Sequence, residues 1–421
     1  MLSCKISRTD RDPGDDDGEP PHKSSVIADN DDLMTEILSH LPVKSLVRFK
    51  SVCKKWLSLI SNPYFCHIHC RGNPLSVSGL FLHKHSSLIK PEFDFVPFDG
   101  NATGIPFRSL SFIDDATGIK MVGSCNGLFC FSCLKDNESR HTHYIYNPAT
   151  KQHTTLPSPV GTNVVALNLA FDPSKSPHYK AVCVRRSGES FESYQIEIYS
   201  SETGSWRPSG NPFYNSYEVV FHNAVYWNGA IHWIGMLETS LYFDIEQEIL
   251  GTMPMPPKYE DQNEGKIIYF GESRGHMHLI EIYGPPATTQ FDVLEMESDY
   301  SKWVVKYHVD LDALPTAYPE MVLNYHNPLN VHRYTFHVLC VVRGEKEEES
   351  SSLVLNIPAS DHLFGVTRRI GTQAIYVLTA EVVDASTMVV CIMMPQHCSA
   401  EANMGSASFT TSQGAMINYT K

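Results

Sequence analysis

The spacing of apolar residues along this chain changes once, from a helical period in residues 33–60 to a strand period from about residue 75 onwards. Leu33, Ile37, Leu38 and Leu41 recur at positions i, i+4, i+5 and i+8, which is the stripe of an amphipathic helix. An acidic pair precedes the stripe and suits the positive end of a helix dipole. Pro42 ends the pattern, because proline lacks an N–H and clashes with the preceding turn. The pattern predicts a short helix that stops at Pro42.

Two more short helical patterns follow the proline. The second pattern contains Val43, Leu46, Val47 and Phe49. The third pattern contains Val52, Cys53, Trp56, Leu57 and Ile60. About forty residues are too few to form an independent core without oligomerisation, a metal or disulfides. We therefore expect these helices to complete their core on another surface, which is a partner or the rest of the same chain.

Two segments of this helical region have a specific order of residues, namely Glu36-Ile-Leu-Ser-His-Leu-Pro-Val-Lys-Ser-Leu46 and Phe49-Lys-Ser-Val-Cys-Lys-Lys-Trp56. The region resembles the F-box of plant F-box proteins. Many members begin with Leu-Pro before the acidic pair, whereas this chain has Ile27-Ala-Asp-Asn30, so the start of the module departs from the pattern. The resemblance implies docking on the Skp-type adaptor of a cullin–RING ubiquitin ligase. The residues it assigns to that contact are Leu33, Ile37, Leu38, Leu41, Pro42, Val43, Leu46, Val47, Val52, Cys53, Trp56 and Ile60.

From about residue 75 to 395, short apolar alternations are separated by Gly, Asn, Asp and Pro turns, which predicts an all-β region. Tyr146, Tyr199, Phe243 and Asp292 lie at equivalent points of a loose repeat of about fifty residues, the period of kelch-like propeller blades. A turn-and-strand element alternates with this repeat: Cys125-Asn-Gly-Leu128, Trp227-Asn-Gly-Ala230 and Ser273-Arg-Gly-His276. The length of the region predicts about six blades.

These repeats also resemble the F-box-associated domains of plants, in Asn126-Gly-Leu, Tyr146-Asn-Pro-Ala-Thr and Trp227-Asn-Gly-Ala-Ile-His-Trp. The resemblance implies that this domain captures the protein to be ubiquitylated. The expected organisation is a disordered acidic segment (1–26), a small all-α F-box module (27–71), an all-β, propeller-like domain (72–395) and a polar tail (396–421). We expect the tryptophans of the β region to pack within and between the blades.

The composition narrows the class of partner. The net charge of −14 over 421 residues argues against a nucleic-acid partner, which would require a basic stripe. Residues 33–71 are nevertheless basic, with six Lys or Arg against one Glu, which favours an acidic protein partner for the module. Eleven irregularly spaced cysteines and the lack of a membrane-spanning apolar run predict a reduced protein of the nucleus, the cytoplasm or both, with no membrane partner.

Several motifs that could indicate enzyme chemistry have simpler interpretations. Gly271-Glu-Ser273-Arg-Gly275 has the spacing of a hydrolase nucleophile elbow, but the flanking alternation predicts a hairpin. Cys130-x-x-Cys133 with His141 and His143 has zinc-like spacing, yet strand positions three apart face opposite sides. His67-Ile-His69-Cys70 is interpreted as packing at the end of the module, and Glu345–Ser352 as a solvated loop. We expect no catalytic residue, no metal and no cofactor.

The leading hypothesis is a non-catalytic substrate receptor of an SCF-type (Skp–cullin–F-box) ubiquitin ligase. In this hypothesis the helical module binds the adaptor, and through it cullin, while the β-domain binds a target protein. A second hypothesis is an F-box protein that binds the adaptor without directing ubiquitylation. A third is a propeller enzyme built around Ser273 or the thiols.

Overall fold

The protein is described by a computed structural model. The residues whose placement it describes are 30–41, 43–62, 64–65, 68–69, 76–84, 92–97, 110, 119–134, 141–148, 151–159, 163–188, 192–215, 219–235, 239–256, 266–282, 288–323, 333–344, 351–358, 364–370, 373–380 and 389–394. The segments 1–26 and 396–421, which we predicted to be a disordered segment and a polar tail, lie outside these residues.

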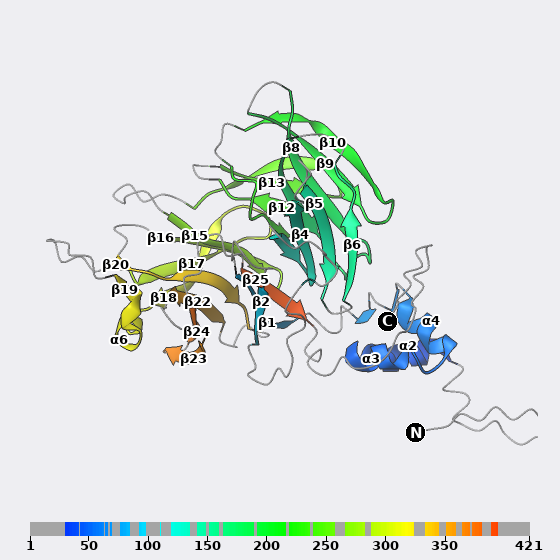
Figure 1. Ribbon diagram of the computed structural model, residues 1–421, viewed down its shortest axis with the longest axis horizontal. Coiled ribbons are helices and arrows are strands. Elements are labelled where there is room, and N and C mark those ends of the chain that lie inside the picture. The colour runs from blue at the N-terminus through cyan, green and yellow to red at the C-terminus, as the bar shows by residue number, and fades with distance from the viewer. Residues whose placement is uncertain are drawn as a thin grey trace, which may run out of the picture.

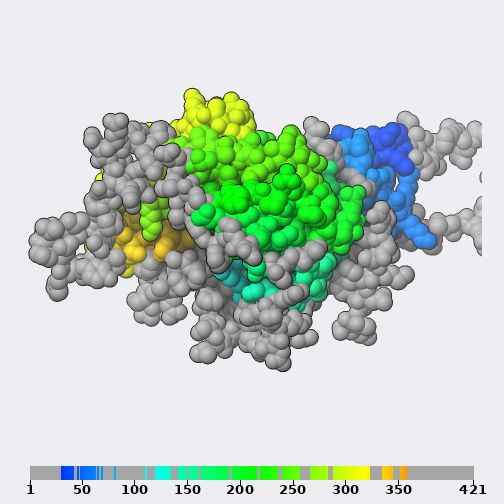
Figure 2. All heavy atoms as spheres, turned by 90° about the horizontal axis from the view of Figure 1, so that it is seen from above, coloured from blue at the N-terminus to red at the C-terminus, as the bar shows by residue number. Residues whose placement is uncertain are grey.

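Three short helices form where the first apolar pattern predicted them: α2 (Asp31–Ser39), α3 (Val43–Phe49) and α4 (Lys54–Ser61). The side chain of Asn30 caps α2 by accepting hydrogen bonds from the backbone N–H groups of Asp32 and Leu33, each at 3.1 Å. These groups have no partner inside the helix, so the cap fixes where α2 begins. The three helices lie together at one end of the molecule (Figure 1 and Figure 2).

The β region contains four consecutive antiparallel sheets in which sequential strands are neighbours. The first sheet consists of β3 (Lys120–Cys125), β4 (Leu128–Leu134), β5 (His141–Asn147) and β6 (Gln152–Leu156). The second consists of β7 (Val164–Ala170), β8 (Lys180–Arg186), β9 (Ser193–Ser200) and β10 (Ser205–Tyr214). The third consists of β11 (Val225–Trp227), β12 (Ala230–Trp233), β13 (Thr239–Asp244) and β14 (Ile249–Pro254). The fourth consists of β15 (Lys266–Ser273), β16 (His276–Ile282), β17 (Gln290–Met296) and β18 (Trp303–Asp310).

The repeat seen in the sequence corresponds to equivalent strands of these sheets. Tyr146, Tyr199, Phe243 and Asp292 all lie on the third strand of their sheet. The alternating element is the turn between the first and second strands of the first, third and fourth sheets. At Asn228 and Gly229 the backbone has φ of 49° and 80°, the two positive values that a two-residue type I′ hairpin turn requires. Asn126-Gly127 and Arg274-Gly275 have the same signs, so the three turns are structurally equivalent.

A fifth and a sixth sheet complete the β region. The fifth contains β21 (His337–Val342), β22 (Ser352–Pro358), β24 (Gln373–Ala380) and β23 (Phe364–Ile370), in that order. It differs from the others because β22 and β24 pair in parallel. Between the fourth and fifth sheets lie α6 (Leu314–Ala317), the 3₁₀ turn η1 (Pro319–Met321) and the pair β19 (Val322–Leu323) and β20 (Arg333–Tyr334). The sixth sheet joins β25 (Val389–Met394) to β1 (Ser76–Lys84) and β2 (Glu92–Pro97).

The six sheets follow one another around a common axis. The first strand of each of the first five sheets contacts the next sheet. The contacting pairs are β3 and β7, β7 and β12, β11 and β15, β15 and β21, and β21 and β25. The rings of Phe81 on β1 and Phe129 on β4, with centroids 5.6 Å apart, bring the sixth sheet against the first. Figure 1 shows β25, near the carboxyl end, beside β1. The prediction of a small helical module followed by an all-β, propeller-like domain of about six blades is confirmed.

The apolar core of this domain lies between consecutive sheets, and tryptophan side chains join them. Trp233 is fully buried between the second and third sheets. The indole N–H of Trp206 donates to the carbonyl oxygen of Pro157 (2.7 Å), and that of Trp303 donates to Pro254 (2.8 Å). In both pairs the proline follows or ends the outermost strand of one sheet, and the tryptophan lies at the start of the outermost strand of another. Among the described residues, no helix is long and apolar enough to cross a membrane.

Candidate functional site

The helical module has a small core of its own. Five apolar side chains are buried in it, with Leu38 only 1% exposed; the others are Met34, Leu46, Ile60 and Phe65. Leu41, Phe49, Trp56 and Leu59 pack against this core and are partly buried. The core is too small to cover the apolar surface of all three helices, so some of that surface faces outwards.

Three of the residues predicted to contact the adaptor are large, apolar and exposed. Leu33 and Ile37 on α2 are 41% and 47% exposed, and Val52, between α3 and α4, is 61% exposed. Leu57 and Tyr64, which were not among the predicted contacts, are also exposed. We call Leu33, Ile37 and Val52 the exposed apolar face of the module. Scattered exposed apolar residues are common, and large apolar side chains are the kind of residue that anchors a protein interface when they are buried by a partner.

The other predicted contact residues divide by burial. Cys53 is exposed, Leu41 and Trp56 are partly buried, and Leu38, Leu46 and Ile60 belong to the module's core. Pro42 and the side chains of Val43 and Val47 lie outside the described residues. A contact between the exposed residues and the adaptor stays a prediction. The buried residues pack in the core of the module and are not accessible to a partner.

Local contacts fix the third helix beside this face. The Sγ atom of Cys53 lies 3.5 Å from the backbone N of Trp56 and caps the start of α4. The Trp56 ring meets Phe49 of α3 edge to face, with ring centroids 4.9 Å apart. Lys55 of α4 forms an ion pair with Asp31 of α2 at 2.9 Å. The Trp56–Phe49 contact joins α4 to α3, and the Lys55–Asp31 ion pair joins α4 to α2.

His69 is a residue of this module whose contact the sequence did not predict. The interpretation of His67-Ile-His69-Cys70 as packing at the end of the module is correct for His69, which is 7% exposed, while His67 and Cys70 lie outside the described residues. The Nε2 atom of His69 lies 2.9 Å from the carbonyl oxygen of Leu41. No local pattern connects two residues so far apart in the chain, so only the folded module identifies this pair.

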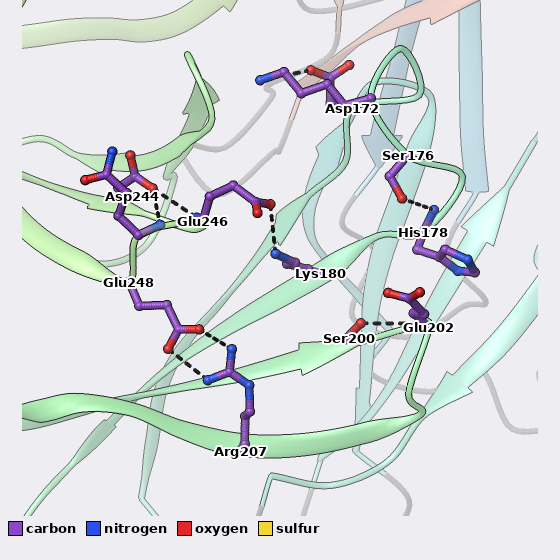
Figure 3. Close-up of polar contacts among 12 residues, drawn as sticks. Asp172, Ser176, His178, Lys180, Ser200, Glu202, Arg207, Asp244, Glu246 and Glu248 are labelled. Atoms are coloured by element: carbon purple, nitrogen blue, oxygen red, sulfur yellow. Dashed lines mark hydrogen bonds and ion pairs between the residues drawn. The ribbon is translucent and has the colours of Figure 1, made fainter. Parts of the chain in front are cut away.

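A second candidate region is the rim of the β-domain formed by the connections between first and second strands and between third and fourth strands. Figure 3 shows its polar contacts between the second and third sheets. Lys180 forms an ion pair with Glu246 at 2.9 Å. Arg207 donates to both carboxylate oxygens of Glu248, one of them at 2.8 Å, and Ser209 donates to the same carboxylate at 2.6 Å. The hydrogen bonds from Arg207 lower the pKa of Glu248 to about 2, so the carboxylate stays charged.

Toward the axis, this rim brings together carboxylates and a tyrosine from adjacent sheets. Burial raises the pKa of Tyr226, and the charges of Asp172, Glu246 and Asp244 raise it further. Burial also raises the pKa of Glu272 to about 7, although the backbone N–H of Gly275 donates to this carboxyl group at 2.5 Å. The rim is a polar, partly acidic surface, and most of its carboxylates already have hydrogen-bond partners within it.

The motifs that suggested enzyme chemistry have structural roles. Ser273 is 1% exposed on β15, and its hydroxyl oxygen accepts a hydrogen bond from the backbone N–H of Arg343 at 3.0 Å. The strand continues into a hairpin with β16, and a nucleophile elbow requires a strand followed by a helix. Cys130 and Cys133 are buried on β4, and burial raises the pKa of Cys130 to about 12, which keeps its thiol protonated. The described part of the chain contains no group of three or more His, Cys, Asp or Glu that could hold a metal ion.

Comparison with known proteins covers both parts of the chain. Residues 30–68 match the F-box domain, and residues 102–311 match the F-box associated beta propeller domain. An F-box protein of Arabidopsis thaliana is 39% identical over 355 residues, covering 80% of this chain and 82% of the relative. A second Arabidopsis F-box protein is 30% identical over 277 residues, covering 60% of this chain and 71% of the relative.

Proposed function

Because this chain belongs to the F-box proteins with an F-box-associated β-propeller domain, we propose that it is a substrate-recognition subunit of an SCF-type ubiquitin ligase. In this proposal the helical module binds a Skp-type adaptor and, through it, cullin. The β-propeller binds a target protein. The two domains typify non-catalytic receptors, and the chemistry is performed by the ubiquitin-charged enzyme that the complex brings close to the target.

The observation that carries the adaptor part of the proposal is the exposed apolar face. Ile37 and Val52 are 47% and 61% exposed, whereas Leu38, next to Ile37, is buried in the module's core. The sequence therefore uses one side of α2 to build the module and leaves Leu33 and Ile37 exposed beside charged residues such as Glu36. Burying a large apolar side chain in an interface stabilises the complex by about 2 kcal/mol.

The target part of the proposal is supported by the architecture of the β-domain. Its sheets bury their apolar residues between one another, so the rims and connecting turns are available for contacts. Loops and turns held by a rigid scaffold are the usual place for binding residues. We place this activity in the nucleus, the cytoplasm or both. The alternative is an F-box protein that binds the adaptor without directing ubiquitylation. Both hypotheses include the adaptor contact, and they differ in whether the bound target is ubiquitylated.

The test compares two substitutions of equal chemistry. Ile37→Asp introduces a charge into the exposed apolar face without touching the core. Ile249→Asp introduces the same charge at a residue of β14 that is 55% exposed, and it serves as the matched control. We expect Ile37→Asp to weaken adaptor binding by at least about tenfold in calorimetry, since a desolvated carboxylate in an interface has no partner. The control is expected to bind as the wild-type chain does.

Wild-type binding by Ile37→Asp would contradict the assignment of this face. Retention of adaptor without co-purifying cullin would favour the non-ligase alternative. Both variants should keep the unfolding transition of the wild-type protein, because both substituted side chains are exposed.

A further inference from the structure

We propose that His69 is a positioning residue for the adaptor contact, because its ring holds the corner between α2 and α3 in the shape that presents the exposed apolar face. This inference rests on the proposed function, since it concerns how the same module would bind the adaptor. His69 itself is buried and therefore acts through the backbone of Leu41.

The corner between α2 and α3 is short. Helix α2 ends at Ser39 and α3 begins at Val43, so only residues 40–42 connect them. Both helices contact α4. A small rotation of the backbone in these three residues would change the angle between α2 and α3. It would also change the position of α2, which bears Leu33 and Ile37, relative to Val52 beyond α3.

Among the residues that the structure describes, three further hydrogen bonds near this corner are local to α2. The backbone N–H of Leu41 donates to the carbonyl oxygen of Leu38 at 3.0 Å. The ring of His40 and the hydroxyl of Ser39 both donate to the carbonyl oxygen of Glu36, each at 2.8 Å. These three bonds define the end of α2.

The Leu41 carbonyl group is different, because its partner comes from beyond α4. The acceptor is a carbonyl oxygen, so the Nε2 atom of His69 carries the proton and donates it over 2.9 Å. The ring of His69 is itself held by stacking on the buried ring of Phe65, with centroids 6.0 Å apart and planes 25° apart. The donor is thus fixed in place by the core of the module. A fixed, buried donor favours one conformation of the corner over the others.

This restriction has a kinetic consequence. If only one arrangement of α2 and α3 fits the adaptor, the apparent affinity falls in proportion to the fraction of molecules in that arrangement. Removing the His69 hydrogen bond would lower that fraction before binding. The loss would then appear in the association rate, while the dissociation rate of the assembled complex would change little.

The experiment uses the full chain and a purified Skp-type adaptor, with binding rates measured by biolayer interferometry. His69→Phe keeps a flat ring that can stack on Phe65 and removes the donor. His69→Gln keeps an N–H donor at the position of Nε2 and removes the ring. The control is His40→Gln, because His40 is an exposed histidine of the same corner whose carbonyl contact stays inside α2.

We expect His69→Phe to bind with an association rate lowered by up to about fivefold, the fold-change that corresponds to a hydrogen bond of average strength. His69→Gln and His40→Gln should bind within about twofold of the wild-type chain. Amide hydrogen exchange in Val43–Phe49 of the free protein should be faster in His69→Phe than in His69→Gln.

Wild-type binding by His69→Phe would overturn the inference, and so would an equal loss in His69→Phe and His69→Gln, which would indicate packing alone. If His69→Phe fails to fold, the His69→Gln variant provides the test. Near-wild-type binding by His69→Gln supports the hydrogen bond, and a loss of about fivefold refutes it. If the wild-type chain does not bind the adaptor at all, the proposed function fails. The exchange measurement then still tests whether His69 holds the corner.

Discussion

Glu295 provides a quantitative test of how the fourth and fifth sheets are held together. Its carboxylate on β17 accepts a hydrogen bond from Arg343, directly after β21, at 2.6 Å. It also lies 3.0 Å from Nδ1 of His276 and 3.5 Å from Nε2 of His278. The side chains of Glu295 and Arg343 are only 13% and 10% exposed. Replacing Glu295 by Gln would leave the Arg343 guanidinium nearly buried without its counter-charge.

The magnitude follows from the pKa of this carboxyl group. Burial alone would raise the pKa, but the nearby ring of His278 and the charges of His276, Arg343 and Lys306 lower it from 4.5 to about 2. Each pKa unit corresponds to about 1.4 kcal/mol, so after allowance for solvent screening the interaction contributes about 2 kcal/mol to the free energy of unfolding at pH 7. A lowered carboxyl pKa stabilises the fold above the unfolded-state pKa. The contribution is lost as the pH falls from about 4.5 towards 2.

The assay is urea unfolding followed by tryptophan fluorescence at pH 7 and pH 3. We expect Glu295→Gln to lower the free energy of unfolding by about 2 kcal/mol at pH 7 and by less than half of that at pH 3. Glu297→Gln is the matched control, since this neighbouring carboxylate is exposed, and it should have little effect at either pH. Equal stability of Glu295→Gln and the wild-type chain at pH 7, or a difference that does not shrink at pH 3, would refute this account of the sheet contact.

Further substitutions test contacts between consecutive sheets and a buried histidine of the third sheet. Trp303→Phe removes the indole donor to the Pro254 carbonyl and is expected to lower the unfolding free energy by about 1 to 2 kcal/mol. The loss should be larger than that of Trp206→Phe, because Trp303 is buried and Trp206 is half-buried. Chemical denaturation of the two variants checks this order, and a larger loss for Trp206→Phe would contradict it. His232 is fully buried, and burial lowers its pKa from 6.5 to about 4. The unfolded chain therefore binds a proton that the folded chain does not, so stability is lost as the pH falls from about 6.5 towards 4. Thermal unfolding of His232→Gln should depend less steeply on pH in that range; an unchanged slope would show that His232 is not the titrating group.

The sequence by itself determined the features that depend on neighbouring residues. The two Asn-Gly turns adopt positive φ at both positions, as this residue pair favours, so their hairpins could be predicted from two residues. The fifty-residue repeat placed Tyr146, Tyr199, Phe243 and Asp292 on equivalent strands. Pro42 and the apolar periods likewise determined the three helices. In each case a short segment contains its own conformational preference.

The tertiary structure decided which apolar residues build the core and which remain open. Leu33, Ile37 and Leu38 all belong to one helical stripe in the sequence, yet Leu38 is buried with Met34 while Leu33 and Ile37 are exposed. Adjacent positions on a helix differ by about 100°, so a stripe this wide does not show which edge faces the module's own core. That choice depends on where α4 packs, which is a contact between distant parts of the chain.

The same reason applies to the pairs that hold the molecule together. Several contacts join residues that no local pattern connects. They are the pairing of β25 with β1, the indole hydrogen bonds to Pro157 and Pro254, and the contact of His69 with Leu41. A hydrogen-bond donor pairs with whichever acceptor the folded chain brings within about 3 Å. The sequence shows which residues carry a donor but does not show which acceptor it will meet. Local propensity therefore specified the helices, hairpins and repeats of this protein, while chain closure, burial and the partners of its buried polar groups were set by packing across the sheets.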